Sequence, residues 1–517
     1  MDSYLTTLLS LACGYGLYSL YKARSQPSLQ YLGPPPPSFV FGHSLDVAQA
    51  PVGTRYPVWE KEYGPTYPLR GPFGKSVMVV GDPKGSNYVM HQKNFQRNPG
   101  DRTLINLCFG YSLFSAEGDE HRTMRKSLSG PFTNQSTQEV SHVFFDLAER
   151  LIQSWEKSLE ASSNDVVDIT GDIHRLTLDG ISMTMFAQDL STMHSDIPAV
   201  IANITHSPPD GMVDITLKTL AGRFPILMKL PSPMKRWCNH LRTSLGAIAK
   251  EVWSGHQADG MHAKLLTALG SQNFSEDITV AHIIGVLFAG SETTANVIID
   301  CFYELSTHPE IQKKLRAELS AFESTTGRQA GYEDLMSPTT LPYLDAVIRE
   351  AIRTRAVLAS VSRVAAEDDV IPLQFPIKRK SDLSEVYEIP VKAGTLIEVP
   401  IRDGLNISET IWGPDAKTFN PERWLKPEGL PETVKWVSAQ GHVLTFGDGL
   451  KVCMGRLFAL AEFKVVVSSV IRRFVLEQVK GNEFDFYHVG GNTIQPMIRG
   501  RESEGPQMPL KLSHVHI

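Results

Sequence analysis

A single cysteine placed among glycines constrains this chain more than any other feature. The segment Phe446–Arg456 reads Phe-Gly-Asp-Gly-Leu-Lys-Val-Cys-Met-Gly-Arg, and the apolar-rich stretch Leu457–Phe474 follows it. Three glycines around Cys453 predict a tightly folded backbone. Because glycine has no side chain, the peptide groups there can approach another group, such as a ligand, closely. A thiolate at the start of a helix is stabilised by free backbone N–H groups and the helix dipole, and both effects lower its pKa. A buried, inert cysteine is the alternative for this segment alone.

Composition and cysteine spacing exclude several classes of protein. The chain has 517 residues, 42% hydrophobic and 21% charged, so it can bury a large core. Its formal net charge of −6 is small for this length, and we expect no nucleic acid partner. The five cysteines lie far apart without any Cys-x-x-Cys spacing, which argues against a disulfide framework and for a reducing compartment. They are Cys13, Cys108, Cys238, Cys301 and Cys453.

Helical periodicity dominates the chain after short strand-like runs around residues 67–69 and 77–80. Helices are predicted at residues 143–159, 278–305, 341–355 and 455–474. Residues 370–399 instead alternate strand-like runs with turns. No repeat, charge block or low-complexity stretch marks a boundary inside residues 38–517. We therefore expect a mainly α fold with a minor β part in one large domain, and not a doubly wound α/β sheet.

An uncharged stretch near the N-terminus has about the length of a short membrane span. Residues 4–21 carry no charge, and Lys22 and Arg24 follow them. This pattern predicts a transmembrane signal anchor over residues 1–21, with the rest of the chain in the cytosol. A buried core helix is the alternative. Residues 22–37 are a polar linker ending in four prolines, which favour a stiff polyproline II spacer.

The spacing Phe-x-x-Gly-x-basic-x-Cys-x-Gly in the cysteine segment resembles the heme-ligand loop of the cytochrome P-450 family. The resemblance implies that Cys453 is the axial ligand of heme b (iron protoporphyrin IX) and that Phe446 packs near the heme. It also implies that Gly449 and Gly455 permit the loop. Lys451 departs from the family, in which arginine or histidine is more usual. Lysine keeps the positive charge for a heme propionate but loses the planar fork of arginine.

A second motif, Ala289–Thr294, reads Ala-Gly-Ser-Glu-Thr-Thr and interrupts the longest predicted helix, for which Ser275 is a suitable N-cap. Its first two residues are small enough for a ligand to lie against the backbone. The resemblance implies that Thr293 hydrogen-bonds bound oxygen or a water beside it, while Glu292 connects to the bulk proton supply. Such a relay is needed because splitting O2 consumes two protons. An exposed face, or a helix contact through small residues, is the alternative.

Two further motifs are expected to form an ionic network. Glu350 and Arg353 lie three residues apart on one predicted helical face, and Arg423 belongs to the later segment Phe419–Trp424. In the P-450 family, which these motifs resemble, the three residues form a buried Glu-Arg-Arg network around the heme loop. We expect that role to be structural and not catalytic. The alternative is an exposed pair, which would contribute roughly a few tenths of a kcal/mol.

Three basic residues resemble the propionate-binding groups of the same family. His121 and Arg125 lie one helical turn apart within Gly118–Lys126, and Arg363 follows the predicted helix that carries Glu350. His121 departs from the family, in which tryptophan is the commonest residue at this position, but its ring can still donate to a propionate. The alternative is that these are isolated, solvated cations.

The segments that the resemblance assigns to substrate contact are largely apolar and suit a lipophilic small molecule such as a terpenoid, sterol or fatty acyl compound. They comprise Leu104, Leu113, Phe114, the helix near Ala289 and Thr293, the segment Val357–Val361, and the turn at Thr493 and Ile494. The stretch Phe224–Arg236 mixes apolar and basic residues. It is expected either to dip into membrane lipid and admit substrate from it, or to form a buried helix edge.

The electrons for such chemistry must come from outside, because the chain has no flavin or dinucleotide fingerprint. For an anchored enzyme, the resemblance implies an NADPH-dependent flavoprotein reductase at the endoplasmic reticulum membrane. Four cations are candidates for the basic surface that docks it: Arg122, Lys126, Lys451 and Lys464.

Three functions are compatible with these motifs. The first is a heme-thiolate monooxygenase that inserts one oxygen atom from O2 into a lipophilic small molecule, by C–H hydroxylation or epoxidation. The second is a heme-thiolate isomerase or dehydratase without O2 activation, and the third a non-enzymatic heme-binding membrane protein. The intact pair Glu292 and Thr293 favours the first. Because Glu367–Pro372 and Trp412–Ala416 resemble fungal members of the family, we predict a role in secondary metabolism such as terpenoid tailoring.

Overall fold

The structure, a computed structural model, describes most of the chain after residue 29. The described residues are 30–38, 40–161, 165–193, 200, 211–221, 225–259, 264–272, 274–479, 485–490 and 493–515. The predicted anchor at residues 1–21 and the first half of the linker therefore lie outside the described residues. Among the described helices, Glu276–Thr307 alone is long and apolar enough to cross a membrane, and most of it is buried inside the protein.

Helices form the bulk of the molecule and strands form its minor part, as the sequence predicts. The α-helices are α2 (Ser44–Gln49), α3 (Tyr56–Tyr63), α4 (Pro83–His91), α5 (Pro99–Cys108), α6 (Gly118–Leu128), α7 (Asn134–Ala161), α8 (Ile169–Phe186), α9 (Leu190–Met193), α11 (Met212–Ala221), α12 (Pro233–Asp259), α13 (Lys264–Gly270), α14 (Glu276–Thr307), α15 (Pro309–Thr326), α16 (Tyr332–Met336), α17 (Pro342–Thr354), α18 (Glu409–Trp412) and α19 (Arg456–Arg473). The strands are β1 (Thr66–Arg70), β2 (Ser76–Val80), β3 (Phe95–Arg97), β4 (Val166–Asp168), β5 (Ser360–Ala365), β6 (Asp369–Lys378), β7 (Glu385–Val391), β8 (Leu396–Pro400), β9 (Phe474–Gln478), β10 (Phe486–Gly490), β11 (Ile494–Ile498) and β12 (Pro509–His514).

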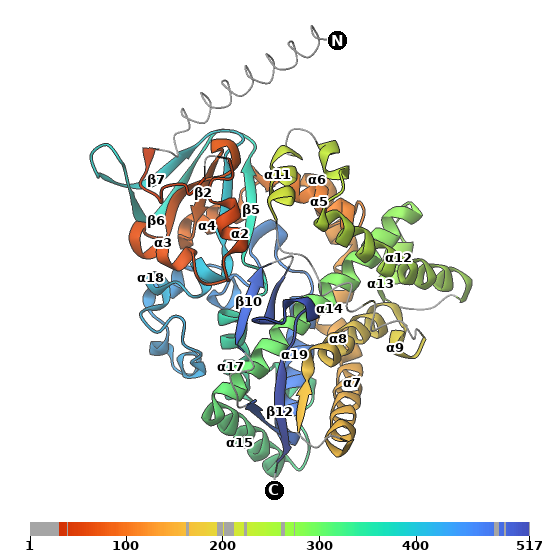
Figure 1. Ribbon diagram of the computed structural model, residues 1–517. Helices are drawn as coiled ribbons and strands as arrows, with labels where there is room; N and C mark the ends of the chain where they lie inside the picture. The colour runs from red at the N-terminus through yellow and green to blue at the C-terminus, as the bar shows by residue number, and fades with distance from the viewer. Residues whose placement is uncertain are drawn as a thin grey trace.

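The strands form four small sheets. The largest has the order β1-β2-β8-β5-β3, and only its β2–β8 pair is parallel. The others are β4-β12-β9, β6-β7 and β10-β11. In Figure 1 the large sheet and β6-β7 gather at one end of the molecule with α2, α3 and α4, while α14 crosses its middle. This segregation of helices and sheets confirms the expectation of a mainly α fold without a doubly wound sheet.

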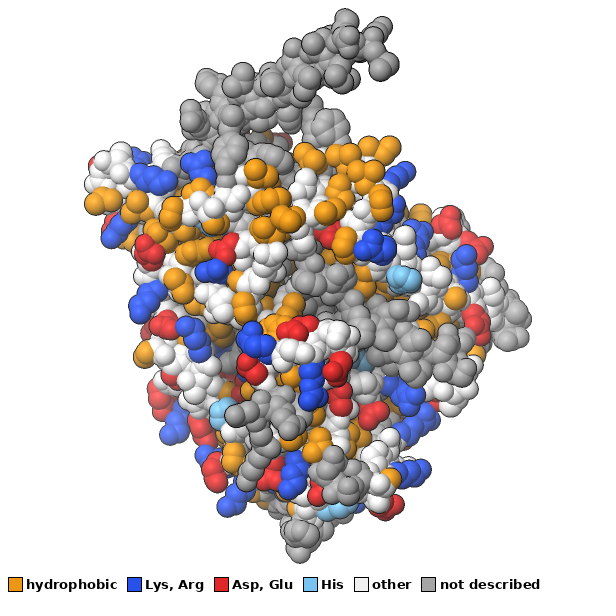
Figure 2. Space-filling model, in the orientation of Figure 1, with side chains coloured by type: hydrophobic (Ala, Val, Ile, Leu, Met, Phe, Trp, Pro, Cys, Tyr) orange, Lys and Arg blue, Asp and Glu red, His pale blue; other side chains and the backbone are white. Residues whose placement is uncertain are grey.

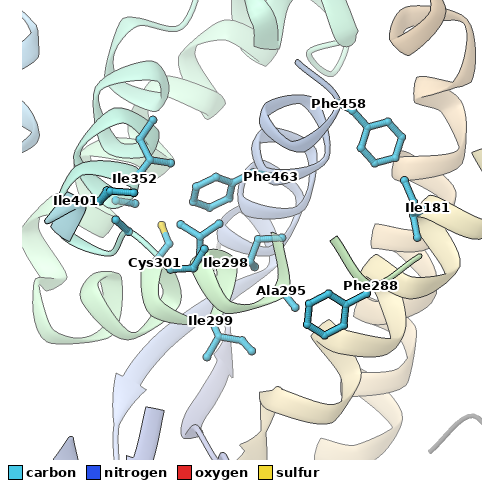
Figure 3. Close-up of a cluster of buried hydrophobic side chains, with 14 of the residues drawn as sticks. Ile181, Phe288, Ala295, Ile298, Ile299, Cys301, Ile352, Ile401, Phe458 and Phe463 are labelled. Carbon is cyan, nitrogen blue, oxygen red and sulfur yellow. The ribbon is translucent and has the colours of Figure 1, made fainter. Parts of the chain in front are cut away.

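The buried helix α14 organises the hydrophobic core. It begins at Ser275, whose side-chain oxygen accepts a hydrogen bond from the backbone N–H of Ile278, as the N-cap prediction requires. Side chains of α14, α17 and α19 point toward one another in the core, as Figure 3 shows for Ile298, Ile352 and Phe463. Each large apolar side chain buried in this way contributes about 1.5–3 kcal/mol relative to exposure.

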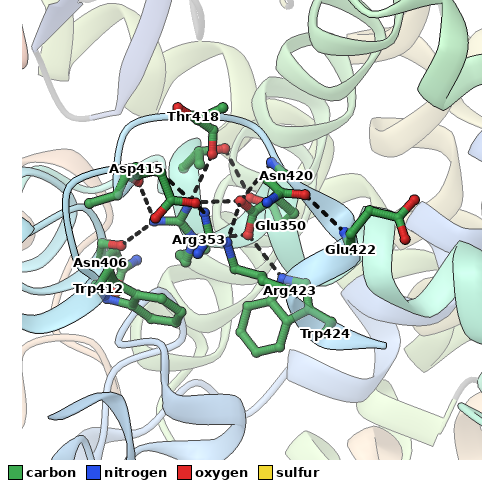
Figure 4. A network of polar contacts seen from close by, with 12 residues as sticks. Glu350, Arg353, Asn406, Trp412, Asp415, Thr418, Asn420, Glu422, Arg423 and Trp424 are labelled. Atoms are coloured by element: carbon green, nitrogen blue, oxygen red, sulfur yellow. Dashed lines mark hydrogen bonds and ion pairs between the residues drawn. The ribbon is translucent and has the colours of Figure 1, made fainter. Parts of the chain in front are cut away.

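A buried ionic network joins α17 to the later segment Phe419–Trp424, as the sequence predicts. Arg353 donates two hydrogen bonds to the Glu350 carboxylate, at 2.8 and 2.7 Å, and Arg423 donates a third at 3.0 Å. The indole N–H of Trp424 and the backbone N–H of Asn420 also donate to this carboxylate, each at 2.9 Å (Figure 4). The carboxylate is therefore surrounded by donors, which offsets the cost of removing its charge from water.

The network reaches the cysteine loop through Asn406. Arg353 donates to the backbone carbonyl oxygen of Asn406 at 2.8 Å. The side-chain oxygen of Asn406 then accepts from the backbone N–H of Leu444 at 2.9 Å, and its side-chain nitrogen donates to Thr445 at 2.8 Å. Because Thr445 immediately precedes Phe446, this chain of contacts positions the start of the cysteine loop.

Replacing Glu350 by glutamine should destabilise the protein by about 3–5 kcal/mol, because two buried guanidinium groups lose their anionic partner. The measurement is the free energy of unfolding from urea titrations followed by tryptophan fluorescence. Glu422 is the matched control, since its ion pair with Lys314 is exposed at both ends, and Glu422→Gln should cost less than about 1 kcal/mol. Equal losses in the two variants would contradict a special role for Glu350.

Candidate active site

The cysteine loop folds tightly before α19. The backbone N–H of Cys453 donates to the carbonyl oxygen of Phe446 at 2.7 Å, which closes the loop. Gly449 has a φ of +62°, and a Cβ there would clash with the backbone of Met90 in α4. This position therefore requires glycine. Gly455 has a φ of −83°, which any residue adopts, so the structure gives no conformational reason for the role predicted for it.

The side chain of Cys453 is exposed, but it faces a cavity inside the protein rather than the outer surface. Surrounding protein desolvates the thiol, and this burial raises its pKa above the usual value. The Gly455 backbone N–H and the charges of Arg125 and Arg456 act in the opposite direction, but more weakly. The backbone N–H at the helix start therefore lowers the pKa of this cysteine as predicted, but burial outweighs that contribution.

The cavity has a volume of about 340 Å³ and brings the two principal motifs together. Ala289, Gly290 and Thr293 of α14 line it, as do Phe446 and Cys453 from the loop. A larger cavity of about 450 Å³, beside α2, β1 and β2, is lined by Ala359 and Ser360 of the predicted substrate segment but by none of the predicted catalytic or heme-binding residues.

Five basic side chains line one part of the smaller cavity. They are Arg97, His121, Arg125, Arg363 and Lys451. Burial, reinforced by Lys451 and Arg125, lowers the pKa of His121 to about 4. Burial also lowers the pKa of Arg363 to about 10, with Arg97 adding to the effect, and the pKa of Lys451 to about 8. The cations therefore disfavour one another's protonation, and a bound anion would relieve this repulsion.

Arg97 is the member of this group that the sequence did not reveal. In the antiparallel pair β3–β5 it lies directly opposite Arg363, and like charges in that position destabilise a sheet. Its Nε is buried and has no hydrogen-bond partner within the described part of the chain. Glu117 supplies part of the compensation, accepting from the Arg97 backbone N–H at 3.2 Å and pairing with Lys451 at 3.1 Å. No motif marks Arg97, because its place opposite Arg363 depends on strand pairing.

On the opposite wall, Thr293 faces the cavity from α14. Its hydroxyl donates to the carbonyl oxygen of Ala289 at 2.8 Å. The lone pairs of the hydroxyl oxygen therefore remain available to accept a hydrogen bond from a molecule in the cavity. Gly290 also lines the cavity, but a Cβ on it would lie only 2.7 Å from Ile181 of α8. For Gly290, close packing of two helices therefore explains the glycine, which was the alternative at this position.

Comparison with known proteins agrees with this geometry. A family model described as cytochrome P-450 matches residues 32–489. The cytochrome P-450 monooxygenases claP and claO of Ampulloclitocybe clavipes are each 34% identical to the chain, over 93% of its length and over 92% and 93% of theirs. Cytochrome P-450 monooxygenase 205 of Postia placenta is 26% identical over 98% of this chain and 97% of its own.

The chain belongs to the cytochrome P-450 family. It is an oxidoreductase of the monooxygenase class, and membership implies heme, O2, a substrate and a redox partner. Two features of this P-450 fit a heme with anionic propionates: a cysteine thiol opens into the cavity, and an unpartnered Arg97 Nε lies beside four further basic side chains.

Glu292 is buried and is not among the described residues that line the cavity, so any link from it to the bulk proton supply passes through its polar neighbours. One of its carboxylate oxygens accepts hydrogen bonds from Asn296, Thr493 and Gln495 at 2.7–2.9 Å. The other, Oε2, lies 3.3 Å from Nδ1 of His174. Successive residues on a helix point about 100° apart, so Glu292 faces β11 and α8 while Thr293 faces the cavity.

The predicted substrate-contact segments divide into two groups. Leu113, Phe114 and the segment Val357–Val361 contribute side chains to the cavity wall, as predicted. Leu104 is buried in the core and does not line the cavity. Thr493 and Ile494 do not line the cavity either. Both are buried, and the hydroxyl of Thr493 donates a hydrogen bond to Glu292 of α14.

The four cations proposed as a docking surface do not form one exposed group. Arg122 and Lys126 are exposed on α6, although Arg122 pairs with Asp119 at 2.9 Å. Lys464 is buried and pairs with Asp345 at 2.7 Å, and Lys451 faces the cavity. These two lysines were therefore wrongly assigned, since helical periodicity does not show that a charge is buried against a neighbouring element.

Gly449→Ala should destabilise the protein by about 1–3 kcal/mol from its left-handed backbone alone, and by more through the clash with Met90. Gly455→Ala is the matched control and should stay within about 1 kcal/mol of the parent, because its φ is ordinary and its nearest neighbour, Phe132, would lie 3.8 Å away. Urea titration of both variants measures the difference. A loss as large for Gly455→Ala would refute this account of the loop.

Proposed function

We propose that this P-450 uses O2 to oxidise a lipophilic small molecule, by C–H hydroxylation or epoxidation, in fungal secondary metabolism such as terpenoid tailoring. The observation that carries the proposal is the shared cavity, which Cys453, Thr293 and the five basic side chains all line. Its remaining wall is largely apolar and includes Phe114, Val286 and Leu358, which suits a lipophilic substrate. The fungal relatives at 26–34% identity support the biological setting.

In this proposal Cys453 is the axial ligand of heme b, and Phe446, Gly449 and Gly455 belong to the loop that presents it. Arg97, His121, Arg125, Arg363 and Lys451 hold the propionates. Bound heme supplies O2 activation, and its thiolate ligand favours cleavage of the O–O bond. The chain contributes a pocket with a largely apolar wall, in which charge–charge interactions are stronger than in water.

Thr293 is proposed as the catalytic hydroxyl on the distal side. Because its proton is directed at the Ala289 carbonyl, its lone pairs can accept a hydrogen bond from a water or another O–H donor in the cavity. Glu292 is proposed as the buried proton source behind it. Its Oε2 has no hydrogen-bond partner among the described residues and lies 3.3 Å from Nδ1 of His174, the neighbour through which a proton would reach it in this proposal. We favour this function over an isomerase or dehydratase because both members of the pair are present.

We also propose that electrons come from an NADPH-dependent flavoprotein reductase and that the enzyme is a single-pass protein of the endoplasmic reticulum membrane with a cytosolic catalytic domain. For docking of the reductase, Lys126 offers an exposed cation on α6. For attachment to the membrane, Figure 2 shows hydrophobic side chains gathered on the upper part of one face. Ile226 and Leu230, 69% and 49% exposed, belong to the stretch expected to enter lipid.

The decisive test of the ligand is the carbon monoxide difference spectrum of the dithionite-reduced protein. The parent should show the strongly red-shifted Soret band of thiolate ligation, and Cys453→Ser should lose it. Cys301→Ser is the matched control, since Cys301 is buried in α14 away from the cavity, and it should keep the band. A parent that binds heme without the red shift would remove Cys453 from the proposal.

Thr293→Val should raise the hydrogen peroxide released per NADPH consumed several-fold, because the hydroxyl that steers protons is lost while the side-chain shape is kept. The assay uses the reductase and a lipophilic compound whose binding shifts the heme absorption. Ser291→Ala is the control on the same helix, since Ser291 donates to Leu287 at 2.7 Å and does not line the cavity. Unchanged peroxide release in Thr293→Val would eliminate the proposed role.

A further inference from the structure

Two buried cysteines face each other on the distal side of the cavity. Cys108 is the last residue of α5, and Cys238 lies in the first turns of α12. Their sulfur atoms are 2.6 Å apart, and the two residues are only 3% and 0% exposed. This separation is about half an ångström longer than a covalent S–S bond of about 2.05 Å. The two sulfurs are therefore close enough to bond after a small movement.

The pair differs from the other described cysteines. Cys301 is equally buried, yet within the described part of the chain it has no sulfur neighbour. Cys453 faces the cavity and belongs to the site already assigned. The sequence spacing of 130 residues between Cys108 and Cys238 gives no hint of their meeting. The wide spacing that argues against a disulfide framework is therefore compatible with one isolated pair.

The neighbours of both cysteines pack against the helix that walls the cavity. The Phe109 ring lies 5.2 Å from Phe288 and 5.8 Å from Phe114. The Trp237 ring lies 6.2 Å from the same Phe288. Phe114 lines the cavity, and Phe288 directly precedes Ala289 of the distal motif. A bond between α5 and α12 would consequently restrain the aromatic layer over the distal wall.

We propose that Cys108 and Cys238 form a reversible disulfide that joins α5 to α12 beside the cavity, with a peroxide as oxidant and a dithiol as reductant. One thiolate attacks the peroxide O–O bond, which gives a sulfenic acid and, from hydrogen peroxide, one water. The second sulfur displaces the sulfenic oxygen as a second water, and the S–S bond forms. Two electrons pass from the sulfurs to the peroxide, and a dithiol returns them by exchange.

Local chemistry sets the conditions for this reaction. The hydrogen bond with Cys238 and burial raise the pKa of the Cys108 thiol well above its usual value, so little thiolate exists at neutral pH. The reduced pair is accordingly the resting form in a reducing compartment. Crosslinking should be slow near neutrality and faster in alkaline buffer, where more thiolate is present.

The test uses the full-length holoenzyme, treated with hydrogen peroxide or with dithiothreitol. Each sample is denatured, alkylated with iodoacetamide and digested with trypsin. Peroxide should produce a crosslinked peptide joining residues 103–122 to residues 237–242, and dithiothreitol should abolish it. Cys301 is the internal reference and should be alkylated equally in both samples. This measurement needs no variant, so it does not depend on a mutant folding.

Two outcomes would overturn the proposal. One is full alkylation of both Cys108 and Cys238 after peroxide treatment, and the other is sulfinic or sulfonic acid at either residue without the crosslink.

A thermal comparison adds a second readout. The peroxide-treated parent should melt a few degrees above the dithiothreitol-treated one, because the bond restrains the unfolded chain. Cys108→Ser should lose this difference, whereas Cys301→Ser should keep it.

Discussion

The buried carboxylate of Glu350 is the contact on which the arrangement of the active site depends. Four residues, Arg353, Arg423, Trp424 and Asn420, donate five hydrogen bonds to it. Arg353 in turn holds the backbone of the segment that leads to the cysteine loop. A carboxylate this deeply buried is stable only with all its partners in place, so the network specifies one arrangement of helix and loop.

Basic side chains that repel one another line the cavity, and contacts within the protein compensate this repulsion only in part. Arg97 and Arg363 oppose each other across a sheet pair, and Lys451, Arg125 and His121 add further basic groups nearby. Local violations of packing rules of this kind are expected at functional sites. An anionic cofactor held among these basic groups would reduce their repulsion, and its binding would then stabilise the folded protein.

The distal helix separates two tasks by its geometry. Thr293 presents a hydroxyl to the cavity, while Glu292, one residue earlier, enters a buried polar cluster with His174. A similar division applies to the cysteines. Cys453 is accessible from the cavity, whereas Cys108 and Cys238 are buried where α5 meets α12. The molecule thus keeps its reactive groups in different environments within a short distance of one helix.

The sequence by itself determined the features that depend on neighbours along the chain. The glycine-rich cysteine loop, the N-cap at Ser275 and the Glu350–Arg353 pair follow from local spacing, and the structure contains all three. Tertiary structure decided what depends on distant segments. Glu292 meets Thr493 across 201 residues, Arg97 meets Arg363 by strand pairing, and Lys464 is buried by its neighbours. No local periodicity encodes such contacts, because they form only when separate elements pack together.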